Sequence, residues 1–205
     1  MICVSDISRC INAHRPHVMP APPSSKHRAA VALILSGADN ALSLCFIKRA
    51  PHPNDPWSGH MALPGGRFEP SDIDSCSVAV RETFEEVGIT LEPEHAIGPL
   101  SEMPIAKHPH PLAGVLSPHV FYVGGSALPF TIDPGEVAEA FWIPLQHICD
   151  PESQSVLSWD DKDYPGIEFQ GEIVWGLTLR VLHSFTQLVG LPLILDELSI
   201  LGERD

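Results

Sequence analysis

Four charged residues stand together within residues 81–88. Arg81 is followed directly by Glu82, and Glu85 and Glu86 come three and four residues after Glu82. In a helix, residues at these spacings lie on one face, so the three carboxylates would crowd together. Like charges placed in this way destabilise a helix by roughly 0.2–0.5 kcal/mol per pair. The segment is therefore either a solvated helix face or a site that receives positive charge.

A hard divalent cation would relieve this repulsion, because Mg²⁺ takes oxygen ligands from one or two carboxylates together with substrate phosphates. Arg81 can pair with one carboxylate and orient it. Gly65 and Gly66 precede this segment, and glycines let a backbone carbonyl approach a metal or phosphate closely. A loop that returns from these glycines to the helix would bring that carbonyl near the carboxylates. Together the two features predict metal-assisted attack of water on a phosphorus atom.

A helix over residues 76–87 must position these groups. Apolar residues recur there at helical spacing and predict a single buried stripe beside the carboxylates, formed by Cys76, Val80, Phe84 and Val87. Asp72, Asp74 and Ser75 offer caps at its start, and Gly88 suits a C-cap.

Short apolar runs predict strands at residues 29–35, 42–47, 61–63, 113–123 and 137–143. We expect the first two to pair as a hairpin and Pro118 to break the fourth. Further helices are expected at residues 7–13, 173–189 and 193–201, and a short one after Pro144. This order indicates an α+β fold or a three-layer α/β/α sandwich. Residues 1–27 are interpreted as an N-terminal extension, with a linker at 20–25, and residues 28–205 as one domain.

The composition limits the classes of function. The chain has 205 residues, 44% of them hydrophobic, which suits one buried core. A net charge of −14 disfavours nucleic acid polymers and anionic membranes as partners, and it means that cations must attract a phosphate substrate. Five cysteines without a C-x-x-C pair indicate reduced thiols and a cytoplasmic protein. The basic residues near the start keep mitochondrial targeting open as the alternative.

These residues resemble the signature of the Nudix hydrolase family, G-x5-E-x7-R-E-U-x-E-E-x-G-U, where U is a bulky apolar residue. Gly66 opens it and residues 81–89 close it. Thr83 replaces the first U, Asp72 stands in place of the first Glu, and the gap before Arg81 is one residue longer. A longer, Asp-containing loop is similar to one branch, the coenzyme A pyrophosphatases.

Other segments are similar to the same branch over about residues 29–190. They are Arg49, Gly59 and residues 62–66, residues 136–145, and Tyr164-Pro165 followed by residues 173–178. However, Asn54 stands where the branch usually has a second Arg, and the loop around it is one residue longer. The resemblance therefore implies a phosphoanhydride hydrolase and leaves the substrate open among coenzyme A, acyl-coenzyme A, ADP-ribose, NADH and dinucleoside polyphosphates.

The resemblance implies a Nudix-type α/β/α sandwich with a central mixed sheet, the signature loop-helix-loop, and bound Mg²⁺ or Mn²⁺. The metal ligands would be Glu82, Glu85, Glu86 and the Gly65 carbonyl, with Arg81 orienting a glutamate. Glu82 and Glu136 are the candidates for the general base. A zinc site is not expected, because the eleven histidines lack zinc-finger spacing.

Three further residues are candidates for substrate binding. Arg49 and Arg67 could hold phosphates bidentately, with a plain surface role as the equal alternative. Trp57 could stack on a base, although its setting in the loop favours packing against the loop instead. A homodimer is left open. Two other classes compete with the enzyme, a catalytically silent Nudix-fold binding module and a metal-buffering acidic protein. The intact carboxylate set argues against the first, and the apolar content argues against the second.

Overall fold

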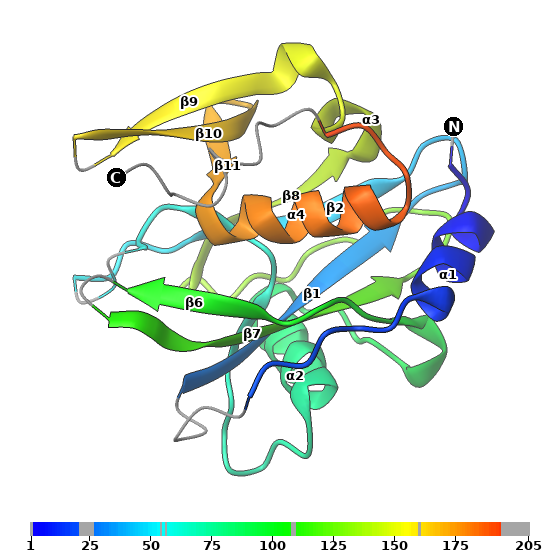
Figure 1. Ribbon diagram of the computed structural model, residues 1–205, viewed down its shortest axis with the longest axis horizontal. Coiled ribbons are helices and arrows are strands. Elements are labelled where there is room, and N and C mark those ends of the chain that lie inside the picture. Colours follow the sequence, from blue (N-terminus) through cyan, green and yellow to red (C-terminus); the bar gives the residue numbers. More distant parts are fainter. Residues whose placement is uncertain are drawn as a thin grey trace.

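An eight-stranded mixed sheet forms the centre of the protein (Figure 1). The structure, a computed structural model, describes residues 2–20, 27–53, 55, 57–107, 110–159 and 161–193. Asn54, most of the predicted linker and all but the first residue of the helix predicted at 193–201 lie outside the described residues. None of the described helices has the length and apolar composition that crossing a membrane requires.

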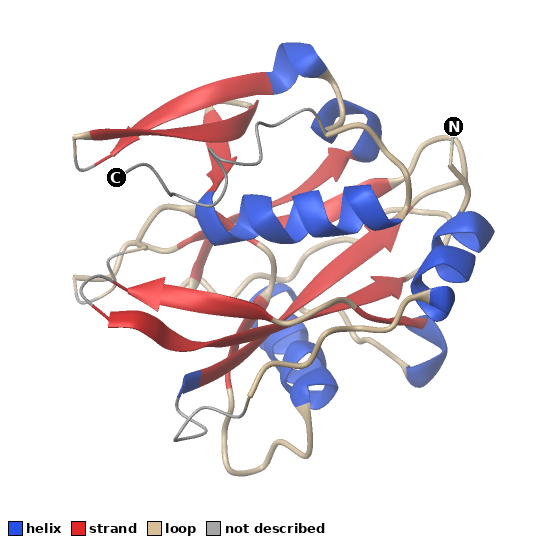
Figure 2. Cartoon of the chain, in the orientation of Figure 1, coloured by secondary structure: helices blue, strands red, loops and turns tan. Residues whose placement is uncertain are grey.

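The central sheet contains β1 to β8, and β1 and β7 are its parallel pair. A separate antiparallel sheet follows in the order β11-β10-β9 (Figure 2). The central strands are β1 Arg28–Ser36, β2 Ser43–Arg49, β3 Met61–Ala62, β4 Gly65–Arg67, β5 Ala96–Pro99, β6 Met103–Lys107, β7 His110–Tyr122 and β8 Val137–Pro144. The small sheet has β9 Gln154–Trp159, β10 Lys162–Phe169 and β11 Glu172–Trp175. The helices are α1 Val4–Ala13, α2 Ser75–Val87, α3 Leu145–Ile148 and α4 Gly176–Leu188, with 3-10 turns at Pro93–His95 and Pro151–Ser153.

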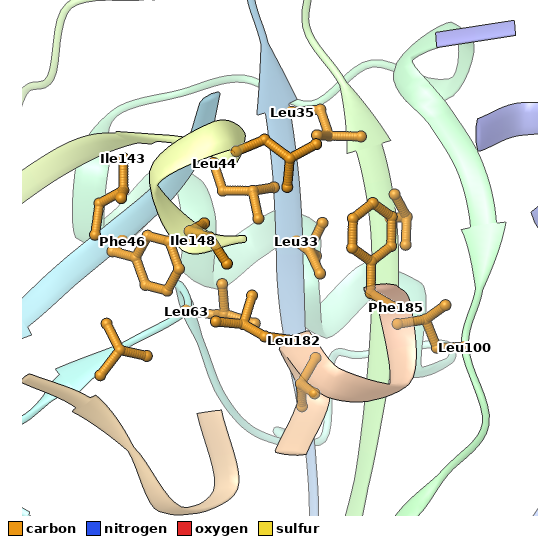
Figure 3. Close-up of a cluster of buried hydrophobic side chains, with 14 of the residues drawn as sticks. Leu33, Leu35, Leu44, Phe46, Leu63, Leu100, Ile143, Ile148, Leu182 and Phe185 are labelled. Atoms are coloured by element: carbon orange, nitrogen blue, oxygen red, sulfur yellow. The ribbon is translucent and has the colours of Figure 1, made fainter. Parts of the chain in front are cut away.

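Alternating side chains of β1 and β2 build two cores, one on each face of the central sheet. Leu33 and Phe46 point to the face covered by α4, where Leu182 and Phe185 pack against them (Figure 3). Ile34 belongs to the opposite core, which contains Val78, Ala79 and Val87 of α2. Helices therefore cover both faces, and the predicted α/β/α sandwich with a mixed central sheet is confirmed. Helix α1 adds its buried Ile7 and Ile11 to the core on the α4 side.

The buried face of α2 differs from the predicted apolar stripe. Phe84 is 59% exposed, and the buried residues are Val78, Ala79, Glu82, Thr83, Glu86 and Val87. The stripe prediction was wrong at Phe84, whereas Cys76, Val80 and Val87 do pack on the core that α2 covers. Two of the carboxylates, Glu82 and Glu86, face the backbone of the glycine pair. The predicted ends are confirmed, since the Asp74 carboxylate accepts a hydrogen bond from Ser77 N at 2.8 Å and Gly88 has a left-handed φ of +71°.

The hairpin predicted for β1 and β2 is confirmed, since the two strands pair in antiparallel orientation at Leu35 and Ser36. The rest of each strand pairs with other strands. Two other predictions need correction. Pro118 does not break β7, since it lies where the outer neighbour of β7 changes from β6 to β5 and no ladder bond to its nitrogen is required. Residues 173–175 belong to β11, and α4 begins only at Gly176.

Candidate active site

Three carboxylates from two separate parts of the chain meet beside the central sheet. Oxygen atoms of Glu82 and Glu86, on α2, and of Glu136, in the turn before β8, all lie within 4.8 Å of one another. Among the described residues, this is the one group of at least three side chains with the spacing that could hold a metal ion. We call these three residues the carboxylate group.

Backbone hydrogen bonds fix Glu136 next to α2. The segment before β8 runs past the end of the helix, where Thr131 N donates to Val87 O at 2.9 Å and Asp133 N donates to Glu86 O at 3.2 Å. Ala50 N, just after β2, donates to the carbonyl of Glu136 at 2.8 Å. Contacts on both sides therefore hold an exposed glutamate against two nearly buried ones.

The glycine pair makes direct contact with the same carboxylates. Gly65 N donates to Glu86 Oε2 at 2.8 Å. A Cβ atom on Gly66 would lie 2.1 Å from Glu82 Oε1, and one on Gly65 would lie 2.3 Å from the carbonyl oxygen of Ala30. Any side chain at either position would collide with the site or with β1. These contacts explain why the two glycines precede the helix at this spacing. They also show that the N–H of Gly65 donates a hydrogen bond to Glu86, a predicted metal ligand.

Arg81 contacts three carboxylates, those of Asp72, Glu82 and Glu85. Its guanidinium donates to both oxygens of Asp72 at 3.1 and 3.0 Å, and its Nη1 lies 2.8 Å from Glu85 Oε2 and 3.0 Å from Glu82 Oε1. The Asp72 side chain is only 4% exposed, and its hydrogen bonds to Arg81 keep the pKa of that carboxyl below its usual range. Asp72, in the place of the first Glu of the signature, thus holds the arginine that contacts Glu82.

Burial perturbs the two inner carboxylates strongly. It raises the pKa of Glu86 to about 8, and the hydrogen bond from Gly65 N opposes this effect only in part. Burial also raises the pKa of Glu82, against the opposing charge of Arg81. Both groups bear a cost when ionised, and a nearby cation would reduce that cost.

The structure does not bring Glu85 into the carboxylate group. Its side chain is 51% exposed and its carboxylate lies on Arg81. Arg67 is also exposed, at the end of β4, and its carbonyl accepts a hydrogen bond from Arg81 Nη2 at 3.1 Å.

Arg49 lies at the end of β2, and its charge acts on Glu86. Its Nε and Nη2 donate to Asp55 Oδ2 at 2.9 and 2.7 Å. The other oxygen of Asp55 accepts from Trp57 N at 3.0 Å. Burial alone would raise the pKa of Asp55, but the Trp57 N–H and the Arg49 guanidinium outweigh it and lower that pKa. Asp55 was not predicted as a partner of Arg49, because an aspartate in a proline-rich loop belongs to no recognisable motif.

Trp57 is 46% exposed and belongs to an aromatic cluster that the sequence did not reveal. Its ring lies 5.6 Å from Trp159 and 6.2 Å from Trp175, between ring centroids. Trp159 comes from β9, a strand that we did not predict.

Comparison with known proteins identifies the family of this chain. The profile of the NUDIX domain matches residues 26–162, which hold the glycine pair, α2 and Glu136. The chain belongs to the Nudix family. An uncharacterized protein of Schizosaccharomyces pombe is 34% identical over 185 residues, covering 76% of this chain and 54% of the relative. A probable Nudix hydrolase of the same yeast is 26% identical, covering 85% of this chain and 61% of the relative.

A Yersinia pestis protein named as an uncharacterized Nudix hydrolase NudL is 27% identical, with 82% of this chain and 83% of that protein covered. The chain thus spans little more than half the length of the two yeast relatives. A crystal structure of a MutT/nudix family protein from Enterococcus faecalis has a TM-score of 0.55 and 17% identity, covering 94% of this chain and 71% of that one, and it supports the Nudix fold.

Proposed function

We propose that this protein hydrolyses a phosphoanhydride bond in a nucleoside diphosphate derivative with the help of Mg²⁺ or Mn²⁺. The observation that carries the proposal is the carboxylate group, held against the glycine pair of a Nudix fold and next to Arg49. The relatives named as Nudix hydrolases support an enzyme of this class.

The residues present fit a divalent metal. All three side chains offer oxygen donors, which hard cations such as Mg²⁺ and Mn²⁺ prefer. Their oxygens already lie within 4.8 Å of one another, close to the spread of about 4 Å that ligands at 2.0–2.1 Å around one Mg²⁺ would span. Glu86 is buried without an ion pair among the described residues. We assign Glu82, Glu86 and Glu136 as the principal ligands and Gly65 as a backbone ligand. Glu85 would first have to leave Arg81.

A divalent cation in this group would neutralise diphosphate oxygens and promote ionisation of water. The protein's own residues supply the rest. Arg81 orients Glu82 through their 3.0 Å contact, and Arg49 offers a planar guanidinium to a phosphate. Glu82 and Glu136 both remain candidates for the base that removes a proton from the attacking water. Arg67 is proposed only as a second phosphate contact, since its side chain is exposed.

We further propose coenzyme A or acyl-coenzyme A as the first substrates to test. Contacts within the segments that resemble the coenzyme A pyrophosphatase branch support this choice. Gly59 N donates to Arg49 O at 3.1 Å, Glu136 belongs to the carboxylate group, and the rings of Tyr164 and Trp175 lie 5.0 Å apart. ADP-ribose, NADH and dinucleoside polyphosphates are the alternatives in the same class.

The test is a panel of these compounds with Mg²⁺ and with Mn²⁺, in the parent protein and in the Glu86→Gln variant. We expect hydrolysis of at least one compound by the parent and loss of nearly all turnover in Glu86→Gln. Glu139→Gln is the matched control, because Glu139 is exposed and lies opposite Lys48 in β2. Absence of hydrolysis with every compound and both metals would favour the silent binding module.

A further inference from the structure

Five ring-bearing residues form a continuous aromatic surface, which we call the aromatic wall. It combines the loop before β3 with all three strands of the small sheet. The ring centroids of neighbouring members lie 5.0–6.3 Å apart, and Trp175 lies closest to Tyr164 and His60, at 5.0 and 5.1 Å. The wall consists of Trp57, His60, Trp159, Tyr164 and Trp175.

The aromatic wall is buried on one side and exposed to solvent on the other. Trp175 is only 7% exposed, whereas Trp57 and Trp159 are 46% and 36% exposed. Burial lowers the pKa of His60, so its ring is neutral at neutral pH and the wall carries no formal charge. Trp57 and Trp159 remain exposed although both rings lie against the buried Trp175. Their free faces offer apolar, polarisable surface to a planar ligand.

The spacing of the two open indoles decides how a ligand could bind. Their centroids lie 5.6 Å apart with planes tilted by 32°. A ring sandwiched between them would need about 7 Å, twice the van der Waals separation of carbon atoms. A ligand ring must therefore stack on the outer face of one indole. This arrangement accepts purines or other flat rings without edge recognition.

A short chain of hydrogen bonds joins the wall to the active site. Asp55 binds Arg49 through one carboxylate oxygen and Trp57 N through the other. Arg49 N also donates to His60 O at 3.1 Å. On the other side, Lys48 of β2 forms an ion pair with Glu172, which fixes β11 and Trp175 beside β2. A diphosphate held at Arg49 therefore lies next to the wall.

We propose that the aromatic wall is the subsite for the planar base of the substrate, which stacks on the open face of Trp57 or Trp159. This inference rests on the proposed function, because it takes the carboxylate group and Arg49 as the place of the diphosphate. The wall recognises a flat ring by stacking, so it does not distinguish adenine from another purine. Specificity for the remainder of the substrate must come from other residues.

The experiment measures binding of AMP and of ribose 5-phosphate in the presence of Mg²⁺, by calorimetry, to the full-length chain and its variants. The two ligands differ only in the base. Because stacking on an aromatic side chain contributes about 1–3 kcal/mol per base, and about 1.4 kcal/mol corresponds to tenfold, Trp57→Ala or Trp159→Ala should weaken AMP about 5- to 150-fold. The Kd for ribose 5-phosphate should change less than twofold.

Two controls separate stacking from damage to the small sheet. Val156→Ala, at another exposed residue of β9, should leave both Kd values unchanged, and Trp159→Phe should recover most of the AMP affinity. If both tryptophan variants bind AMP like the parent, or lose both ligands equally, the wall is not a base subsite. Neither result depends on turnover. A protein that binds AMP on the wall but hydrolyses no substrate would therefore refute the proposed hydrolase activity and leave the proposed base subsite standing.

Discussion

Glu86 should make the metal-free protein less stable as the pH rises. Burial raises the pKa of its carboxyl from 4.5 to about 8, so between these values the folded state keeps a proton that the unfolded state has lost. Stability then falls with increasing pH. Each pKa unit corresponds to about 1.4 kcal/mol. Glu86 therefore lowers the free energy of unfolding by about 1 kcal/mol near pH 5, about 3 kcal/mol near pH 7 and about 5 kcal/mol near pH 9.

Glu86→Gln removes this cost, because the amide has the same shape and no charge, and its oxygen can still accept the hydrogen bond from Gly65 N. We expect the free energy of unfolding of the variant in EDTA to exceed that of the parent by about 3 kcal/mol near pH 7, and by more near pH 9. Urea unfolding followed by circular dichroism measures this difference. Mg²⁺ at 1,000 times the Kd should reverse the order near pH 7, since it stabilises the parent by about 4.1 kcal/mol and stabilises the variant little.

The control is again Glu139→Gln, which should follow the parent with and without Mg²⁺. If the parent and Glu86→Gln lose stability in parallel from pH 5 to pH 9 in EDTA, Glu86 does not carry the buried charge that we assign to it. If Mg²⁺ stabilises both proteins equally, Glu86 is not a metal ligand. The two results are independent, so one part of the reasoning can fail alone.

Three other substitutions test the site, two by steady-state kinetics and one by Mg²⁺ binding. Glu136→Gln should lower kcat about 10²- to 10⁴-fold if Glu136 is the general base; recovery of kcat at high Mg²⁺ would show that it is only a ligand. Gly66→Ala should weaken Mg²⁺ binding with an unchanged circular dichroism spectrum, because the added Cβ would displace Glu82, and normal Mg²⁺ affinity would contradict that contact. Arg49→Lys should raise KM for a diphosphate substrate about tenfold, as expected for the loss of about 1.4 kcal/mol, and an unchanged KM would remove Arg49 from phosphate binding.

Local patterns in the sequence predicted the elements that follow periodic rules. The helix caps at Asp74 and Gly88 depend on neighbouring residues alone, and they were predicted correctly. The apolar stripe failed because Phe84 fits the helical period but faces solvent, while charged Glu82 and Glu86 point inward. Carboxylates that are buried to form a functional site break the usual preference for apolar cores. The spacing of apolar residues alone therefore cannot reveal which face of such a helix is buried.

The long-range parts of the site were not predictable in the same way. Glu136 was chosen as a base candidate from its turn and from resemblance, but only the fold shows its oxygens beside those of Glu82 and Glu86. Asp55 and Trp159 escaped notice because neither stands in a motif. Asp55 matters because it pairs with Arg49. Trp159 lies on β9, a strand whose residues alternate only weakly in polarity.

The balance of charge around the site indicates why it needs cations. Two nearby guanidiniums are already engaged, Arg81 with Asp72 and Glu85, and Arg49 with Asp55. Six carboxyl groups lie around them, those of Glu82, Glu85, Glu86, Glu136, Asp72 and Asp55. A diphosphate would add more negative charge to a chain that already carries −14. Arginines that are held by aspartates can turn toward a phosphate only when the local field becomes less negative. We therefore expect metal binding to precede productive substrate binding, and the substrate Kd to depend steeply on Mg²⁺ concentration.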